Sequence, residues 1–318
     1  MEKNYGIRIE FVDIAKIVGM FLIIYGHTLR GGMLTTWLYS FHVPLFFFLS
    51  GVTFHYESYQ LKEFIMKRLK VLLFPFLIWA LISIVIFTII SDFVFVESSL
   101  CFGKTNPFVN ILMGYCDVNS PLWFLPCLFI TELLMWFVIK IYYRIGKWFC
   151  LWVGLISLVV CSAWPIMNEK EIFWNVHTAV IILPFSMLGY LFGEKLDRVP
   201  FTLKGFGIAF VFTIGGGLIG TLFNHQIGYL GCCYGNPILF YLSAILSILG
   251  ICYMCKGIPY NRKMLYLGSN TMEALVMHKF LVMFFLVCPI VKHYVTSSYP
   301  IVCAGISFIT MIICFLAS

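Results

Sequence analysis

Apolar segments of about 20 residues, nearly free of charge, recur along the chain and constrain its fold more than any other feature. Apolar residues make up 61% of the chain and charged residues only 11%. A water-soluble protein has about 25% charged residues, so this composition cannot cover a water-facing surface. We therefore expect an all-α, polytopic integral membrane protein, with residues 1–318 forming a single membrane-embedded domain.

Ten candidate spans follow when a window of about 20 residues, the length that crosses a bilayer core, is applied to the chain. They cover residues 10–29, 35–54, 70–91, 122–142, 148–164, 175–193, 205–223, 237–255, 265–288 and 299–317. Between the second and third spans, residues 56–70 are expected to form a short amphipathic helix on the membrane surface. Residues 92–120 are expected to form the one long loop.

Basic residues are divided unequally between the two sets of connections. Alternate connections, beginning with the N-terminus, carry 15 of the 21 Lys and Arg residues, and the opposite set carries four. Lysine and arginine are enriched in cytoplasmic loops, so both termini are expected in the cytoplasm. The net charge of +7 is explained in the same way and indicates no nucleic-acid partner. We expect a multi-pass protein of a cell membrane, most simply the bacterial inner membrane.

The first span carries three ionisable residues, Asp13, Lys16 and His27. On a helix they lie within about 60° of one another, and Lys16 and His27 are about 16 Å apart along the axis. Charge inside a bilayer is costly unless it faces a partner or a watery cavity, so this face is expected to point into the bundle. It is either an internal Asp–Lys pair with a capping histidine, or a polar passage that ends at an imidazole suited to general base catalysis.

Other ionisable residues lie inside the spans as well. His42 is expected at nearly the same depth as His27, on the next span, and two imidazoles at matched depth favour a functional site. Glu132 and Glu273 are intramembrane carboxylates, which we expect to pair with Lys279 or with histidines of the bundle, or to take part in chemistry.

Lys16 and His27 are separated by ten residues, and four further motifs follow them in the chain. These are FHVPLFFFLSG (41–51), FIMKRLKVLLFPF (64–76), PLWFLPCLF (121–129) and LGSNTMEALVMH (267–278). Together, and in this order, the five features resemble acyltransferase family 3, a family of membrane enzymes that O-acylate sugars. The chain is most similar to the fucose 4-O-acetylase-like subgroup of that family.

The resemblance implies an O-acetyltransferase that uses cytoplasmic acetyl-CoA as acyl donor and a hydroxyl of a cell-surface or lipid-linked sugar as acceptor. It implies an acyl-CoA, a glycan and membrane lipid as partners, and no metal. His27 is the expected general base, with Asp13 and Lys16 completing the catalytic face; an acyl-His27 intermediate is an alternative. The residues expected to hold the CoA phosphates are Lys67, Arg68 and Lys70.

Five further residues in the matching motifs are expected to bind or orient the acceptor. They are His42, Ser50, Trp123, Asn270 and His278. Trp123 also fits the ordinary role of a tryptophan at the membrane interface. The main alternative function is a transporter or flippase in which the intramembrane charges form a proton relay. The ordered motifs and the lack of a visible internal repeat favour the enzyme.

Overall fold

The computed structural model describes residues 8–29, 31–56, 60–94, 106–167, 172–229, 233–287 and 299–317. Among these residues the chain is helical, and the only bridge between extended segments joins Gly228 and Cys233. The elements in chain order are α1 (Glu10–Thr28), α2 (Met33–Val52), α3 (Leu61–Arg68), η1 (Leu69–Leu73), α4 (Phe74–Val94), α6 (Pro107–Met113), η2 (Asp117–Trp123), α7 (Phe124–Ile145), α8 (Trp148–Met167), η3 (Phe173–Asn175), α9 (Val176–Arg198), α10 (Leu203–Leu222), α11 (Pro237–Cys255), α12 (Arg262–Ser269), α13 (Thr271–Val287) and α15 (Pro300–Ala317).

Eight helical segments within the described part of the chain are long and apolar enough to cross a membrane. They agree with eight of the ten expected spans, and the all-α membrane fold is confirmed. The expected span 148–164 coincides with the apolar helix Trp148–Trp164 within α8. The expected span 265–288 is divided between two helices, α12 and α13. Helix α12 ends at Ser269, and the next residue, Asn270, caps it by donating its N–H to the carbonyl groups of Tyr266 and Leu267. The count of ten spans and the cytoplasmic termini stay predictions.

Two connections differ from the expectation. Of the surface helix expected at 56–70, residues 57–59 lie outside the described residues and the later part is present as α3, which continues through η1, a π-helical turn, directly into α4. Part of the expected loop at 92–120 is helical, because α4 extends to Val94 and because α6 and η2 lie within the range, while residues 95–105 lie outside the described residues. Helix α6 begins where it does because the Asn106 side chain accepts a hydrogen bond from the backbone of Phe108 and Pro107 fits the first helical position.

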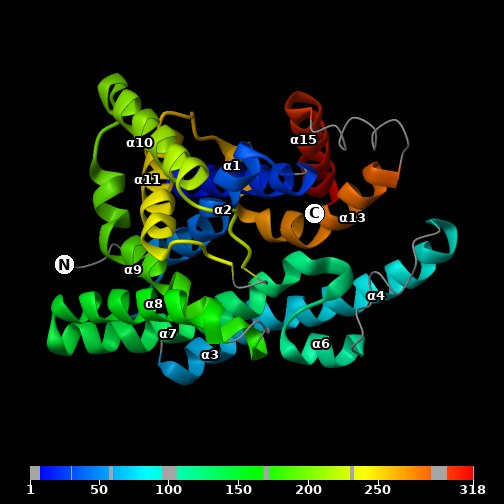
Figure 1. Ribbon diagram of the computed structural model, residues 1–318, viewed down its shortest axis with the longest axis horizontal. Coiled ribbons are helices and arrows are strands. Elements are labelled where there is room, and N and C mark those ends of the chain that lie inside the picture. Colours follow the sequence, from blue (N-terminus) through cyan, green and yellow to red (C-terminus); the bar gives the residue numbers. More distant parts are fainter. Residues whose placement is uncertain are drawn as a thin grey trace.

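Helices α1 and α2 occupy the middle of the bundle. In Figure 1 they lie between α9, α10 and α11 on one side and α13 and α15 on the other, with α4, α7 and α8 along the lower edge. Helix α1 contacts α2, α11, α12, α13 and α15. Of the 18-residue apolar stretch of α1, 67% of the residues are buried inside the protein, against 28% for α10. The ionisable face of α1 therefore points into the protein, as its sequence predicts.

Helices α2 and α9 approach each other closely at two glycines. A Cβ atom on Gly51 would lie 1.9 Å from the carbonyl oxygen of Ser186, and one on Gly189 would lie 2.0 Å from that of Phe48. Only glycine permits backbones to approach this closely, which is the usual role of small residues between membrane helices. This contact fixes the position of α2, the helix that carries two of the predicted site residues.

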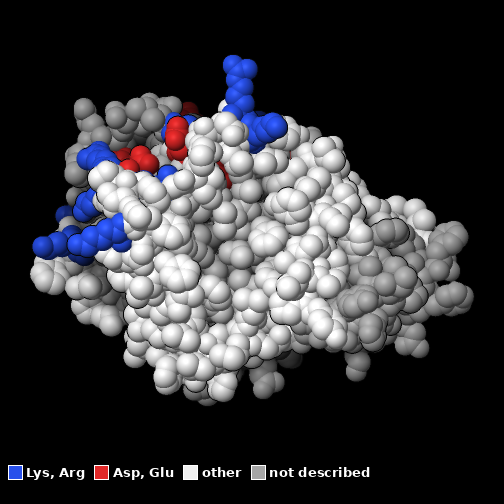
Figure 2. Space-filling model, turned by 90° about the horizontal axis from the view of Figure 1, so that it is seen from above, with Lys and Arg blue, Asp and Glu red and all other residues white. Residues whose placement is uncertain are grey.

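The surface agrees with a membrane environment. Figure 2 shows charged side chains gathered near one edge of the face in view, while the other described side chains on that face are uncharged. Large apolar side chains are exposed on the outer helices, such as Val85 and Ile89 on α4 and Val211 on α10. Water would make such a surface costly, whereas lipid acyl chains solvate it. The chain is a multi-pass membrane protein.

Candidate functional site

Three histidines and a tyrosine from three helices meet at one end of α1. The ring centroids of His27 on α1 and His278 on α13 are 5.3 Å apart. Tyr39 on α2 lies edge-on to both His27 and His42, with centroid distances of 6.3 and 4.9 Å. We call these four residues the histidine cluster. It brings together three of the predicted site residues, and it joins the two imidazoles that the sequence places at matched depth.

The three imidazoles of the histidine cluster differ in exposure and in hydrogen bonding. His278 and His42 are buried, with exposed fractions of 0% and 3%, whereas His27 is partly exposed. The Nδ1 atom of His278 lies 2.7 Å from the carbonyl oxygen of Leu275, and that of His42 contacts the carbonyl oxygen of Leu38. A carbonyl group only accepts, so both Nδ1 atoms carry a proton. His27 is thus the ring of the three best placed to reach a substrate.

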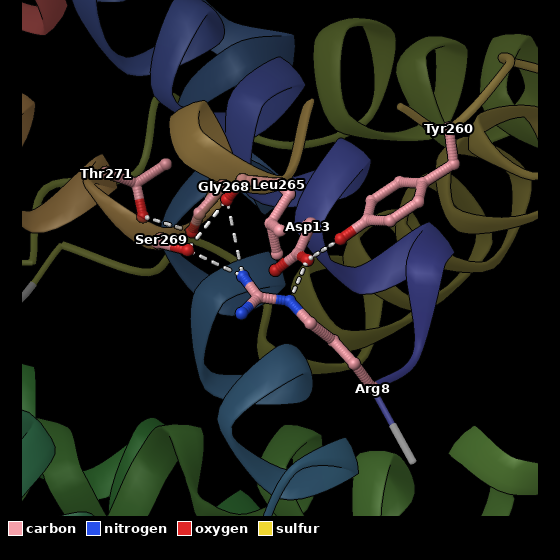
Figure 3. Close-up of polar contacts among 7 residues, drawn as sticks. All are labelled: Arg8, Asp13, Tyr260, Leu265, Gly268, Ser269 and Thr271. Carbon is pink, nitrogen blue, oxygen red and sulfur yellow. Dashed lines mark hydrogen bonds and ion pairs between the residues drawn. The ribbon is translucent and has the colours of Figure 1, made fainter. Parts of the chain in front are cut away.

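A second polar group lies at the opposite end of α1 and includes Asp13 (Figure 3). The buried Asp13 carboxylate accepts hydrogen bonds from Arg8 Nε at 2.5 Å and from the Tyr260 hydroxyl at 2.7 Å, and Arg8 Nη2 donates to the Ser269 hydroxyl at 2.7 Å. These four residues form the Asp13 cluster. The expected pairing of Asp13 with Lys16 is not found in the described part of the chain, because Arg8 and Tyr260 occupy the carboxylate instead.

The Asp13 cluster ties the start of α1 to the chain around α12. The hydrogen bond to Asp13 raises the pKa of Arg8, and burial together with the hydrogen bond to Asp13 raises the pKa of Tyr260. Two donors on different parts of the chain thus hold the Asp13 carboxylate. Asp13 is about 21 Å from His27 along the helix, so the cluster holds the helix in place and does not contact the imidazole.

Replacing Tyr260 by phenylalanine is expected to lower stability by about 1 kcal/mol while leaving the rate of acyl transfer within about twofold of wild type. The Asp13 carboxylate loses one donor, but the aromatic ring and Arg8 stay. Thermal unfolding of the purified protein in detergent measures the stability. Tyr142→Phe is the control, since its hydroxyl has no hydrogen bond among the described residues. A large loss of rate at unchanged stability would instead place the Asp13 cluster in the chemistry.

A cavity of about 190 Å³ lies between the two clusters, among α1, α2, α7, α13 and the segment formed by α3 and η1. Residues that line it include Lys16, Ile23, Ser50, Arg68, Glu132 and Leu275. Along α1 the cavity extends from Lys16 to Ile23, one helical turn before His27. On α13 it reaches Leu275, one turn before His278. It therefore leads from the Asp13 end of the bundle toward the histidine cluster.

Arg68 and Glu132 form a buried ion pair at the wall of this cavity. Arg68 Nε lies 2.7 Å from one oxygen of Glu132, and the Ser50 hydroxyl donates to the other at 2.7 Å. Glu132 thus pairs with an arginine and not, as expected, with a lysine or histidine, because packing brings α3 against α7. A buried carboxylate needs such a partner. Lys67 and Lys70 lie on the same helical stretch and stay exposed.

Two of the residues expected at the acceptor site lie elsewhere. Asn270 stands at the junction of α12 and α13, next to Ser269 of the Asp13 cluster. Ser50 lines the cavity and bonds Glu132. The structure therefore brings neither residue to His27. Helical geometry accounts for this, since Asn270 precedes His278 by eight residues, or about 12 Å.

Trp123 lies near the histidine cluster, but it is largely covered. Its ring stacks on that of Tyr229 with a centroid distance of 5.9 Å and an interplanar angle of 21°, and only 7% of it is exposed. The Tyr229 hydroxyl donates to the backbone carbonyl of Tyr39 at 3.0 Å. Trp123 is therefore connected to the cluster through Tyr229 and Tyr39.

A family model for an acyltransferase domain, that of acyltransferase family 3, matches residues 9–318. The chain belongs to acyltransferase family 3. No match is found among curated proteins or among solved structures. The matched region contains the histidine cluster, the cavity and, except for Arg8, the Asp13 cluster. The protein is thus a membrane acyltransferase that transfers groups other than amino-acyl groups, and the finer fucose 4-O-acetylase-like assignment stays a prediction.

Three residues of this acyltransferase were missed by the sequence reasoning. Tyr39 carries a usable signal, because it precedes His42 by three residues and so shares its helix face. Arg8 and Tyr260 carry no signal in the sequence that links them, because they lie outside the apolar segments and 252 residues apart in the chain. Only the packing of α1 against α12 brings them to the same carboxylate.

Proposed function

We propose that this acyltransferase transfers an acetyl group from cytoplasmic acetyl-CoA to a hydroxyl of a cell-surface or lipid-linked sugar, with His27 as general base. The observation that carries the proposal is the polar face of α1. It begins beside a cavity at Lys16 and ends at the partly exposed imidazole of His27. The bias of basic residues puts the Lys16 end at the cytoplasm, so donor and acceptor would approach His27 from opposite sides.

The cavity supports the donor half of the proposal. Lys16 gives one end a positive charge, since Glu132 offsets the charge of Arg68, and the other walls are largely apolar, as a thioester on a flexible arm requires. The cavity volume of about 190 Å³ is the space into which such an arm would extend. The exposed Lys67 and Lys70 would hold the phosphates outside the cavity.

The chemistry requires one proton transfer in each direction. His27 removes the proton from the acceptor hydroxyl while the hydroxyl oxygen attacks the carbonyl carbon of the thioester. A carbon–oxygen bond forms as the carbon–sulfur bond breaks, and His27 returns the proton to the departing sulfur. His42 and Trp123, both buried, would help orient the acceptor indirectly, through their contacts with Tyr39 and Tyr229. Ser50 would hold Glu132 and, through it, Arg68 on the donor side.

Surface glycans provide the test of this function. Cells of the source strain with and without the chain are supplied with an isotope-labelled acetyl group, and the O-acetylation of their surface glycans is measured by mass spectrometry. We expect labelled O-acetyl esters only when the chain is present. Purified protein in vesicles, given labelled acetyl-CoA, separates the alternatives: uptake of an intact solute without release of CoA would support a carrier, and an unchanged glycan would remove the support for a sugar acceptor.

A further inference from the structure

We propose that His278 acts through His27: it holds the His27 imidazole in one tautomer and stabilises its protonated form during acyl transfer. The proposal rests on the proposed role of His27 as base. It gives His278 a positioning role, different from the acceptor binding that its sequence motif suggests.

The hydrogen bonds of His278 fix which of its nitrogen atoms carries a proton. Its Nδ1 atom lies 2.7 Å from the carbonyl oxygen of Leu275 and 3.2 Å from that of Ala274. Both oxygens can only accept, so Nδ1 is the donor and Nε2 of the neutral ring is left with a free lone pair. Two carbonyl groups on one N–H also fix the orientation of the ring.

The lone pair on Nε2 of His278 is buried and unused. The side chain is 0% exposed, and Nε2 has no hydrogen-bond partner among the described residues. An unsatisfied buried acceptor costs about 1–3 kcal/mol, so native proteins retain few of them without a reason. A role in packing alone gives no such reason, because an apolar ring would fill the same space without this cost.

His27 is the imidazole ring that lies beside His278. The two centroids are 5.3 Å apart and the ring planes are tilted by 33°. His27 is partly exposed and His278 is sealed from the surface, so a substrate would meet His27 and not His278. Catalytic hydrogen bonds are often long before the substrate binds, and they tighten in the reactive complex. The proposed contact requires His27 to rotate so that one of its N–H groups points at Nε2 of His278.

The arrangement has a defined consequence for the reaction. When one nitrogen of His27 donates to Nε2 of His278, the other nitrogen must carry the lone pair that receives the hydroxyl proton. The imidazolium that forms on His27 keeps its hydrogen bond to His278 until the proton passes to the departing thiolate. His278 is neutral before and after, and no proton is left on it. The base is thus oriented by a third group, as in other activated base systems.

Two substitutions separate this role from packing and from acceptor binding. His278→Phe keeps the ring and removes the acceptor, whereas His278→Gln keeps an acceptor atom. We expect kcat to fall about 10–100-fold in the phenylalanine variant and by less in the glutamine variant, with the KM for acetyl-CoA within about twofold of wild type in both. Rates are measured as label transferred from acetyl-CoA to surface glycan in membranes, per folded molecule counted by size-exclusion chromatography.

The control is the same substitution at a buried histidine outside the histidine cluster. His177 is 3% exposed and stacks on Trp164, so His177→Phe should leave kcat unchanged. A wild-type kcat in His278→Phe would overturn the inference, as would a raised KM for the acceptor with kcat intact. If His278→Phe does not fold, two other results would overturn the inference. One is a wild-type kcat in a second apolar variant, His278→Leu. The other is a loss of rate in His278→Gln as large as that in His27→Gln.

The proposed function and this inference fail in different ways. If His27→Gln keeps the wild-type rate in this assay, the assignment of the base is wrong, and the role of His278 falls with it. If His27→Gln is inactive and His278→Phe is fully active, only the inference about His278 is wrong.

Discussion

Replacing His27 by glutamine is expected to lower the rate of acyl transfer by about 10²–10⁴-fold, the usual contribution of a positioned general base. Glutamine fills a similar volume between Tyr39 and His278 but cannot take up a proton. The amount of folded protein should therefore stay unchanged. The measurement is the transfer of labelled acetyl from acetyl-CoA to surface glycan, normalised to folded protein.

A surface histidine supplies the matched control for this experiment. His225 is exposed beyond the end of α10, so His225→Gln makes the same chemical change away from both polar clusters and should keep the full rate. A His27→Gln variant with more than about a tenth of the wild-type rate would contradict a role for His27 as the base.

The second large effect is expected from a single methyl group at Gly51. The Cβ atom of Gly51→Ala would lie 1.9 Å from the carbonyl oxygen of Ser186 and 2.9 Å from its Cα atom, so α2 and α9 would have to separate. Overpacking against side chains costs about 1–3 kcal/mol, and a clash with backbone is expected to cost at least the upper end of that range. Because α2 carries Tyr39 and His42, activity should be lost together with the fold.

Gly154 offers the same substitution without the clash. It lies inside α8, and a Cβ atom there would meet nothing within 4 Å. Gly154→Ala should be neutral or slightly stabilising, because alanine is the better helix former. The yield of monodisperse protein and its thermal unfolding in detergent compare the two variants. Equal stability of Gly51→Ala and wild type would mean that α2 and α9 are not packed in this way.

Most of the helices could be predicted from the sequence, because span length and helical period are local properties. A run of about 20 apolar residues must be helical in a bilayer whatever its neighbours are, since lipid offers its backbone no hydrogen bonds. The same argument places the ionisable face of α1 toward the protein. The prediction of a single helix from apolar length fails for residues 265–288, where the hydropathy is continuous but the backbone turns at Asn270.

The candidate site could be predicted only in part. The spacing of Lys16 and His27 and the depth of His42 follow from helical periodicity, and they identify the face that matters. The contacts of those residues do not follow from it. Asp13 is bonded to residues on both sides of it in the chain, one of them 247 residues away, and Glu132 is bonded to an arginine 64 residues before it.

The sequence by itself therefore determined that this is a helical membrane protein, which segments are apolar, and which face of α1 bears the ionisable groups. The tertiary structure alone decided the partner of each buried group: His278 beside His27, Arg68 on Glu132, and Tyr260 on Asp13. The physical reason is one of range. Hydropathy and helical period act between near neighbours in the chain, whereas the partner of a buried charge or lone pair depends on which helices pack together.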